Sequence, residues 1–348
     1  MGLTIIRILQ VGLGNRGRMW GRILSEHPQA SLAGIVDPDP ARIEAYRAEF
    51  GAVPSFPELG AALAAVDADA VLLVTPPDGH LEQARLVFAA GLPLLAEKPL
   101  ALDLAEAREI VALGQAAALP LTVGLNFRYL PVSREIRRLV AAQVVGAPGY
   151  GTFNYHRNRD WWRPGMNKYP LAMRHPMMLE QSIHHLDLIR FCYGREVEAV
   201  SCRTWNPSWS VYAHDANVSC LLTLEGGMDV AYMGTWTGGW NELKFQWRTD
   251  CEKGVIIQQE LFSSLAMART EDPKLTPLPL DPCVPFLDDT RLLLDDFLDA
   301  LATGRQEPCT GADHLKSLAL CFAAIEANET GQRVTMRDFY RRHGLDAL

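Results

Sequence analysis

Short apolar segments alternate with amphipathic ones over the first 125 residues of this chain. The apolar segments have the length of strands, and the segments between them repeat their apolar positions at helical spacing. The predicted strands are Ile5–Val11, Leu32–Val36, Ala70–Val74, Leu92–Ala96 and Leu121–Val123. The predicted helices are Arg16–Glu26, Ala41–Phe50, Leu81–Ala90 and 103–118. Strands without a polar face, each followed by a helix, predict a parallel sheet that is covered on both sides.

Beyond residue 125 the alternation stops, and strand-like segments follow one another with turn signals between them. This arrangement favours an antiparallel or mixed sheet. The clearest strands are Tyr150–Asn158, Ala216–Leu224, Met228–Thr237 and Leu243–Arg248. The predicted helices are Pro131–Ala142, Met177–Tyr193, 288–301 and 312–327, and the proline-rich segment 273–285 is predicted to be a surface loop.

The length of 348 residues supports two domains, which we place at 1–124 and 125–348, with the last two helices able to pack back on the first. Acidic side chains number 41 and basic ones 33, so the net charge is −8. This balance argues against a nucleic-acid surface, which needs clustered Lys and Arg. The seven cysteines are scattered without a CxxC pair, which argues against a disulfide framework or a thiolate zinc site.

No apolar segment approaches the roughly 20 residues that cross a bilayer, and the apolar segment Ile5–Val11 is short and leads directly into a glycine turn. We therefore expect neither a signal peptide nor a membrane anchor. Together with the scattered cysteines, this predicts a cytoplasmic protein.

A glycine pattern follows the first predicted strand. Gly12, Gly14 and Gly17 have the GxGxxG spacing, with Asn15 and Arg16 between them, and they open a predicted helix. The first glycine allows a tight turn, the second allows a pyrophosphate to approach the backbone, and the third allows close packing of helix and strand. The helix N-terminus favours phosphate through its free N–H groups. The alternative is a strand–turn–helix unit without a ligand.

Asp37 lies 20 residues after Gly17, at the end of the second predicted strand. A carboxylate at this position accepts hydrogen bonds from the ribose hydroxyls and repels a 2′-phosphate. The sequence therefore favours NAD over NADP. NADP stays an alternative cofactor because the side chain of Arg42 could turn toward this position.

The tripeptide Glu97-Lys98-Pro99 follows the predicted strand that ends at Ala96. A lysine at the end of a later strand of a dinucleotide-binding unit would face the reactive end of the cofactor. Lys98 is therefore a candidate catalytic residue, and the alternative is a surface lysine.

Glu180 and His184 are four residues apart on a predicted helix, and Asp187 follows three residues later. This spacing places them near one helix face. His184 is a candidate general base, and the alternative is a histidine that serves packing. The neighbouring His185 points about 100° away, so the pair cannot easily chelate a metal, and we expect no metal site.

These motifs occur in an order that resembles the glucose–fructose oxidoreductase and inositol dehydrogenase family (Gfo/Idh/MocA). The likeness extends over nearly the whole chain and is strongest through residue 128 and around 176–194. It implies a Rossmann domain and an α/β domain with a large, open, mostly antiparallel sheet. In relatives that sheet commonly forms the interface of a homo-oligomer, which implies a homodimer or homotetramer for this chain.

The resemblance also implies roles for the site residues. Lys98 would contact the reacting hydroxyl or carbonyl, and relatives often hold the bond to Pro99 in the cis form. His184 would take the hydroxyl proton, with Glu180 and Asp187 orienting substrate and histidine. The chain departs from the family in having Glu180 where relatives commonly have Asp and Ser182 where they have Gly, which puts the substrate geometry in doubt.

Further positions match the family less specifically. Thr75, Pro77, His80, Glu97 and Asn126 match positions at the cofactor. Arg128 matches a position near the substrate. Arg157, Trp162 and Arg163 belong to a basic and aromatic segment that suits a sugar or an anionic polyol, and a surface loop or subunit contact is the equally weighted alternative.

The sequence thus predicts an NAD-dependent oxidoreductase that moves a hydride between nicotinamide and a secondary alcohol or carbonyl of a sugar, inositol or related polyol. Two alternatives stay open. Some relatives use tightly held NAD to cleave glycosides without net redox change, and an NAD-binding regulator would need no catalysis. The presence of both Lys98 and His184 argues against the regulator.

Overall fold

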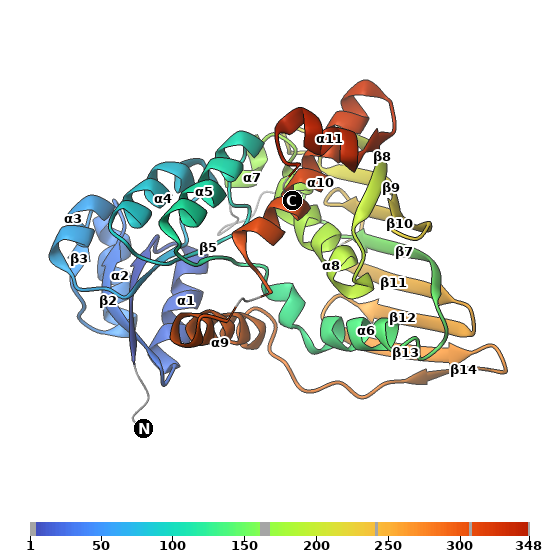
Figure 1. The fold of residues 1–348 in the computed structure, drawn as a ribbon, viewed down its shortest axis with the longest axis horizontal. Coiled ribbons are helices and arrows are strands. Elements are labelled where there is room, and N and C mark those ends of the chain that lie inside the picture. Colours follow the sequence, from blue (N-terminus) through green and yellow to red (C-terminus); the bar gives the residue numbers. More distant parts are fainter. Residues whose placement is uncertain (1–4, 161–167, 241–242, 306–307, 347–348) are drawn as a thin grey trace. The chain divides into compact units, whose positions relative to one another are not determined.

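The computed structural model describes residues 5–160, 168–240, 243–305 and 308–346. The chain divides into two compact units, each with its own sheet (Figure 1). The first unit comprises the chain up to Asn126 together with Phe286–Leu315. The second comprises Phe127–Pro285 and the chain from Lys316 onward. The segment 286–315 therefore lies with the first unit, although it follows most of the second unit's sheet in the sequence.

The first unit contains a six-stranded sheet in which every neighbouring pair is parallel. Its strands are β1 (Ile6–Val11), β2 (Ala30–Val36), β3 (Ser55–Phe56), β4 (Ala70–Leu73), β5 (Leu94–Ala96) and β6 (Leu121–Val123). They lie in the order β3-β2-β1-β4-β5-β6, the order of a doubly wound dinucleotide-binding sheet. The predicted parallel sheet is confirmed.

Helices connect these strands and cover the sheet. They are α1 (Asn15–Glu26), α2 (Pro40–Phe50), α3 (Leu59–Ala65), α4 (His80–Ala89), α5 (Leu104–Ala117) and, from the later segment, α9 (Asp288–Thr303). Helices α4 and α5 lie side by side (Figure 1). Asp103 caps α5 by accepting hydrogen bonds from the N–H groups of Ala105 and Glu106. Helix α3 was not predicted, because seven mostly small residues carry little helical periodicity.

The second unit contains a nine-stranded sheet in the order β14-β13-β12-β11-β7-β10-β9-β8-β15. Only the pair β7–β10 is parallel, so the sheet is mostly antiparallel, as predicted. Its strands are β7 (Pro148–His156), β8 (Val197–Trp205), β9 (Asn217–Leu224), β10 (Met228–Thr235), β11 (Lys244–Cys251), β12 (Gly254–Glu260), β13 (Ser263–Arg269), β14 (Asp272–Pro277) and β15 (Val334–Thr335).

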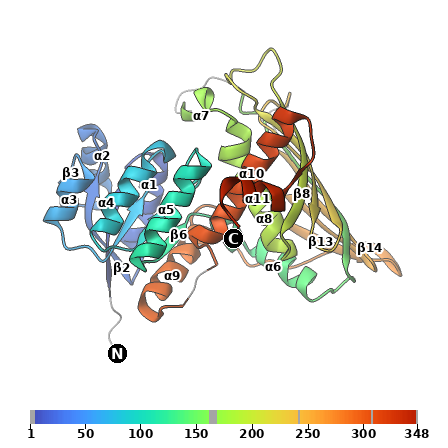
Figure 2. The ribbon, with the colours of Figure 1, turned by 45° about the horizontal axis from the view of Figure 1, so that its top comes forward.

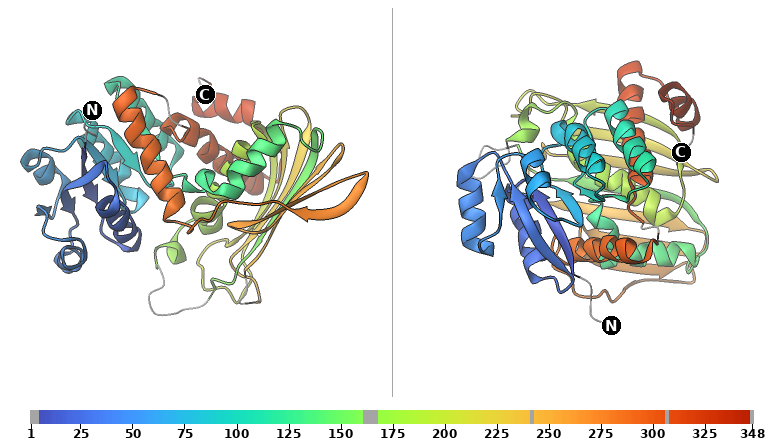
Figure 3. Two further views of the ribbon diagram at one scale, coloured as in Figure 1. Left: turned by 90° about the horizontal axis from the view of Figure 1, so that it is seen from below. Right: turned by 60° about the vertical axis from the view of Figure 1, so that its left-hand side comes forward.

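Within the second unit, the helices gather on one face of the sheet (Figures 2 and 3). They are α6 (Pro131–Ala141), α7 (Tyr169–Ala172), α8 (Ile183–Tyr193), α10 (Gly311–Thr330), which begins in the first unit, and α11 (Met336–His343). On the strands, Tyr150 and Leu221 are about half exposed, at 52% and 50%. In the described part of the chain, no helix covers the opposite face of the sheet.

The segment 273–285, predicted to be a loop, begins as part of strand β14. This prediction was wrong for its first residues. Pro273 and Pro277 are tolerated because β14 is the edge strand of the sheet, where a missing backbone N–H interrupts no central ladder.

The helix predicted over Met177–Tyr193 begins with a π-helical segment, Met177–Ser182, before α8 starts at Ile183. The wider turn changes the angular spacing between Glu180 and His184. Their common face therefore does not follow from regular α-helical spacing. Segments of this kind are rare and are frequent at functional sites.

A buried polar chain joins the start of α8 to the sheet. The Tyr232 hydroxyl lies 2.9 Å from His185 Nδ1 and 2.7 Å from the Ser182 hydroxyl. Gln181 Nε2 lies 3.1 Å from His185 Nε2. Burial lowers the pKa of His185 to about 3, so the ring is neutral. A neutral ring that accepts from Gln181 carries its proton on Nδ1 and donates to Tyr232.

We expect Tyr232→Phe to lower the free energy of unfolding by about 1–3 kcal/mol, because it leaves His185 and Ser182 without their shared partner. Tyr155→Phe is the matched control, since that buried hydroxyl makes only a 3.3 Å contact with Gln181. Urea unfolding of the three proteins measures the difference. Equal losses of unfolding free energy in both variants would contradict a stabilising role for the hydrogen bonds of Tyr232.

Candidate active site

The glycine turn after β1 is sterically locked. Gly12 has a φ of +96°, and a Cβ there would lie 2.6 Å from the carbonyl oxygen of Val74. A Cβ on Gly17 would lie 2.2 Å from the carbonyl oxygen of Gly12. A side chain with contacts this short would force the backbone to shift, so both positions favour glycine in the turn between β1 and α1.

Gly14 differs from its two neighbours in the motif. A Cβ built on it meets nothing within 4 Å. Gly14 is the N-cap of α1, makes no side-chain capping bond, and is followed by no acidic residue in the first turn. Within the described part of the chain, the first N–H groups of α1 therefore have no capping side chain, and their partial positive charge favours an anion. This arrangement fits the pyrophosphate of a dinucleotide.

The side chain of Gln10 holds the glycine turn through hydrogen bonds. Its side-chain amide donates to the carbonyl oxygens of Gly12 (3.2 Å) and Gly17 (2.8 Å), and its own carbonyl accepts from the Tyr46 hydroxyl at 2.8 Å. Sequence reasoning missed this pair. The signal was a polar residue among the buried apolar residues at the end of the strand, Ile8, Leu9 and Val11, two residues before the first glycine.

Asp37 lies at the end of β2, as predicted, and is 2% exposed. Its carboxylate accepts from the backbone N–H groups of Leu13 and Asp39, both at 2.9 Å. Arg42 lies 3.7 Å from the same carboxylate. Asp37 therefore fixes the glycine turn, and its role at the ribose stays a prediction.

Glu97 is a buried carboxylate that accepts two side-chain hydrogen bonds. Its Oε1 atom accepts from Arg16 Nε at 2.7 Å and from Trp20 Nε1 at 2.8 Å. Burial raises the pKa of Glu97, but the Arg16 charge and the two hydrogen bonds outweigh it, so the pKa is below its usual range. Arg16 also donates to the hydroxyl of Thr290 on α9 at 3.2 Å.

Lys98 follows Glu97, is half-buried, and is joined to Pro99 by a cis peptide bond, as the family resemblance implied. Two histidines hold the next part of this loop. His80 lies 3.0 Å from the Leu100 carbonyl oxygen and 3.1 Å from that of Thr75, and the Leu100 N–H donates to His314 Nε2 at 3.2 Å. The loop that carries Lys98 is therefore tied to the turn after β4.

His80 faces a carbonyl oxygen with each ring nitrogen, and only a doubly protonated ring can donate to both. Burial nevertheless lowers the pKa of His80.

Two other predicted cofactor residues lie near His80 in the sequence. Pro77 is buried, and Thr75 donates its hydroxyl to Gln83 at 2.6 Å.

Asn126 is the last residue of the first of the two segments that make up the first unit, and it is 3% exposed. Its side-chain nitrogen lies 2.6 Å from Oδ2 of Asp289, at the start of α9. Asp289 comes from a segment far away in the sequence and was not predicted as a site residue.

In the second unit, His184 is 7% exposed, and its ring stacks on Phe127 with a centroid distance of 4.3 Å. Phe127 in turn packs edge-on against Phe262. Glu180 is half-buried in the π-helical segment. His185 faces the sheet, among Phe153, Tyr155 and Tyr232, so the two histidines have separate surroundings, as the helix geometry predicted.

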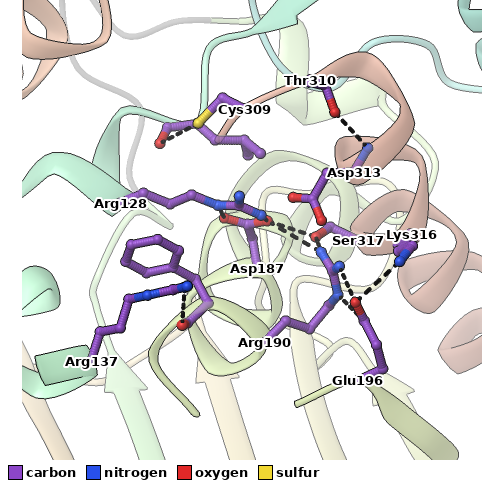
Figure 4. Close-up of polar contacts among 12 residues, drawn as sticks. Arg128, Arg137, Asp187, Arg190, Glu196, Cys309, Thr310, Asp313, Lys316 and Ser317 are labelled. Atoms are coloured by element: carbon purple, nitrogen blue, oxygen red, sulfur yellow. Dashed lines mark hydrogen bonds and ion pairs between the residues drawn. The ribbon is translucent and has the colours of Figure 1, made fainter. Parts of the chain in front are cut away.

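Arg128 and Asp187 bind each other (Figure 4). Arg128 donates through Nε at 2.7 Å and through Nη2 at 2.5 Å to the two carboxylate oxygens, and both side chains are buried. The Ser317 hydroxyl of α10 donates to Asp187 at 2.6 Å. This arrangement holds α8 against the start of the second unit. Substrate contact by Arg128 and catalysis by Asp187 stay predictions.

The same network continues along α8 (Figure 4). Arg190 donates to Ser317 at 2.5 Å and to Glu196 at 2.7 and 2.9 Å, and Lys316 lies 3.4 Å from Glu196. The network thus connects α8, the start of β8 and α10.

Of the basic and aromatic segment, Arg157 is exposed, and its backbone N–H pairs with the Thr235 carbonyl. Trp162 and Arg163 lie outside the described residues. Arg159, two residues after Arg157, stacks over the buried ring of Trp236 at 4.3 Å.

Neither a metal cluster nor a membrane span was found where the chain is described. No three His, Cys, Asp or Glu side chains come together there in a way that could hold a metal ion. None of the helices described is long and apolar enough to pass through a bilayer.

Two family models match the chain. Residues 6–125 match the oxidoreductase family with an NAD-binding Rossmann fold, and residues 133–257 match the GFO/IDH/MocA C-terminal domain. The chain belongs to the Gfo/Idh/MocA oxidoreductase family. Its first unit is thus an NAD-binding Rossmann fold, and the protein is an oxidoreductase of the sugar and polyol dehydrogenase class.

Individual relatives span nearly the whole chain. A D-apiose dehydrogenase from Rhizobium rhizogenes is 25% identical over 96% of this chain and 98% of its own. An uncharacterized protein, y4oX, from Sinorhizobium fredii is 26% identical over 98% of both. The structure of an Agrobacterium radiobacter oxidoreductase in complex with NAD+, L-tartaric acid and magnesium superimposes with a TM-score of 0.86 at 22% identity, over 96% of this chain and 99% of that one.

The glycine turn gives a matched pair of substitutions. We expect Gly14→Ala to fold with nearly unchanged stability, because its Cβ meets nothing, and to lose affinity for NADH, because the added carbon occupies the phosphate approach. Gly17→Ala should lower the free energy of unfolding by about 1–3 kcal/mol through overpacking. Thermal unfolding and NADH fluorescence titration measure the two effects. Unchanged NADH binding by Gly14→Ala would refute the assignment.

Proposed function

We propose that this Gfo/Idh/MocA protein is an NAD-dependent dehydrogenase acting on a secondary alcohol of a sugar, inositol or related polyol. The observation that carries the proposal is the uncapped α1 N-terminus at Gly14, in the same unit as Lys98, which is held at the end of β5. The named relatives include dehydrogenases of D-apiose and of inositol, which supports the substrate class.

When bound, NAD supplies the hydride acceptor at its nicotinamide ring. The remaining steps fall on side chains. His184 takes the proton of the reacting hydroxyl, and Lys98 donates a hydrogen bond to the oxygen on which negative charge develops. Glu180 binds a substrate hydroxyl. Asp187, through its pair with Arg128, keeps α8 and therefore His184 in place.

Asp37 supports NAD over NADP. Its buried carboxylate accepts two backbone hydrogen bonds, one from Leu13 in the glycine turn and one from Asp39. A 2′-phosphate near this charge would be repelled. Arg42 lies 3.7 Å from the carboxylate and partly offsets the repulsion.

The reaction can be tested by NADH formation across a panel of sugars, inositols and sugar acids, with NADP in parallel. We expect turnover with NAD and little with NADP. Lys98→Ala and His184→Ala should each lower kcat by about 10²–10⁴, the usual contribution of a placed acid or base. Lys274→Ala, on the exposed edge strand, is the control.

NADH binding without turnover of any panel member would favour the redox-neutral glycosidase, which retains its cofactor through purification. Full activity in both the Lys98 and His184 variants would exclude a catalytic role for either side chain.

The open sheet face of the second unit supports association between copies of the chain. Tyr150 and Leu221 are half exposed on it. We propose a homodimer or homotetramer through this face, because burying apolar side chains favours assembly. Light scattering should give a molar mass at least twice that of the 38.6 kDa chain. Replacing both residues, as Tyr150→Arg with Leu221→Arg, should shift the mass toward the monomer, and an unchanged mass would place the interface elsewhere.

A further inference from the structure

Asp289 is a buried carboxylate of the first unit. It lies in the first turn of α9 and is fully buried, at 0% exposure. Its Oδ2 atom lies 2.6 Å from the side-chain nitrogen of Asn126. Among the residues that the structure describes, no hydrogen bond of normal geometry reaches its Oδ1 atom. A buried carboxylate with one neutral side-chain partner is costly, because desolvation penalises the charge.

The charged groups around Asp289 compensate it only in part. Arg16 on α1 is the nearby cation, and it is already paired with Glu97. On α9 itself, Asp288 and Arg291 pair with each other at 3.6 Å. Burial raises the pKa of Asp289 to about 6, while Asn126, Arg16 and the first backbone N–H groups of α9 pull it down less strongly. A site that served stability alone would be better filled by a neutral side chain.

The hydrogen bond from Asn126 to Asp289 fixes the orientation of the Asn126 amide. An ionised carboxylate only accepts hydrogen bonds, so Asn126 must direct its NH2 group toward Asp289. The amide oxygen of Asn126 then points the other way. The carboxamide of nicotinamide carries an NH2 group that needs an acceptor of this kind.

We propose that Asp289 is a positioning residue for the cofactor, which in its ionised form holds the Asn126 amide so that its oxygen accepts from the nicotinamide carboxamide. This inference rests on the proposed function, in which Asn126 lies at the nicotinamide. A protonated Asp289 can donate a hydrogen bond, which allows the Asn126 amide to turn around. Its NH2 group would then meet the NH2 group of the carboxamide, and binding would weaken.

The direction of the pH effect follows from the charge. Asp289 is ionised above its pKa of about 6, so NADH affinity should be highest at pH 7–8 and fall as the pH is lowered toward 5. The free energy of unfolding should change in the opposite direction and fall as the pH rises. Because the pKa of an unfolded Asp is about 3.9, the folded protein binds the proton more tightly. The resulting loss of stability is absent below about pH 4, grows as the pH rises toward the folded-state pKa of about 6, and is complete above it.

The test compares the wild type with Asp289→Asn, which is neutral at every pH, and with Asp299→Asn, an exposed position on the same helix, as the control. NADH fluorescence titrations from pH 5 to 8 give the affinity, and ADP-ribose, which lacks the nicotinamide, is titrated by competition. We expect the wild type to lose roughly 3–10-fold in NADH affinity at low pH, the value of one hydrogen bond. Asp289→Asn should bind NADH at every pH as weakly as the wild type does at low pH. Its affinity for ADP-ribose should be unchanged.

Two further measurements separate positioning from damage to the fold. Ligand-free Asp289→Asn should melt at a higher temperature than the wild type at pH 7.5, with the difference shrinking toward pH 4. In an Asn126→Ala background, Asp289→Asn should change NADH affinity no further, since coupled residues are not additive.

Each contrary result has a distinct meaning. The inference is overturned if Asp289→Asn keeps the pH dependence of the wild type, or if it loses affinity for NADH and ADP-ribose equally. Neither result would contradict the proposed dehydrogenase function. Failure of the wild type to bind NADH or NADPH at any pH overturns the proposed function, and this inference with it.

Discussion

The buried carboxylate of Glu97 is the constraint on which the nucleotide half of the molecule depends. It binds Arg16 and Trp20 from α1, and Arg16 extends the connection to Thr290 on α9. Removing a carboxylate from water is expensive unless charge and hydrogen bonds compensate it, and in this unit they do so well enough to keep the pKa of Glu97 below its usual range. The helix that would receive a pyrophosphate and the loop that carries Lys98 are thereby held by one side chain. The start of α1 and the position of Lys98 therefore depend on the same side chain.

The second unit uses the same device around Asp187. A buried carboxylate again binds an arginine, here Arg128 through two hydrogen bonds, and it also accepts from a hydroxyl of a late segment, Ser317. In both units, a pair of one carboxylate and one arginine connects an early element to a helix encoded near the end of the chain, through Thr290 in the first unit and Ser317 in the second. A neutral packing contact would tolerate small displacements. A bidentate ion pair does not, because both its distance and its plane are fixed.

The sequence was most informative where local geometry alone dictates the residue. The turn at Gly12 and Gly17 admits no side chain, so its spacing reveals the strand, the turn and the helix together. Contacts between distant segments had no such signature. Gln10 under the turn and Asp289 beside Asn126 act through partners that only the folded chain brings near. The π-helical start before α8 was hidden for another reason, since its residues are equally compatible with a regular α-helix.

The first unit is built from two separate stretches of sequence, with nearly the whole second sheet between them. During synthesis, the residues up to Asn126 leave the ribosome long before Phe286–Leu315 exists. Throughout that interval Arg16 lacks Thr290, Asn126 lacks Asp289, and the Leu100 N–H lacks His314. The nascent first unit is thus unfinished at the loop that carries Lys98. Completion of the cofactor site is consequently one of the last events in the biogenesis of the protein.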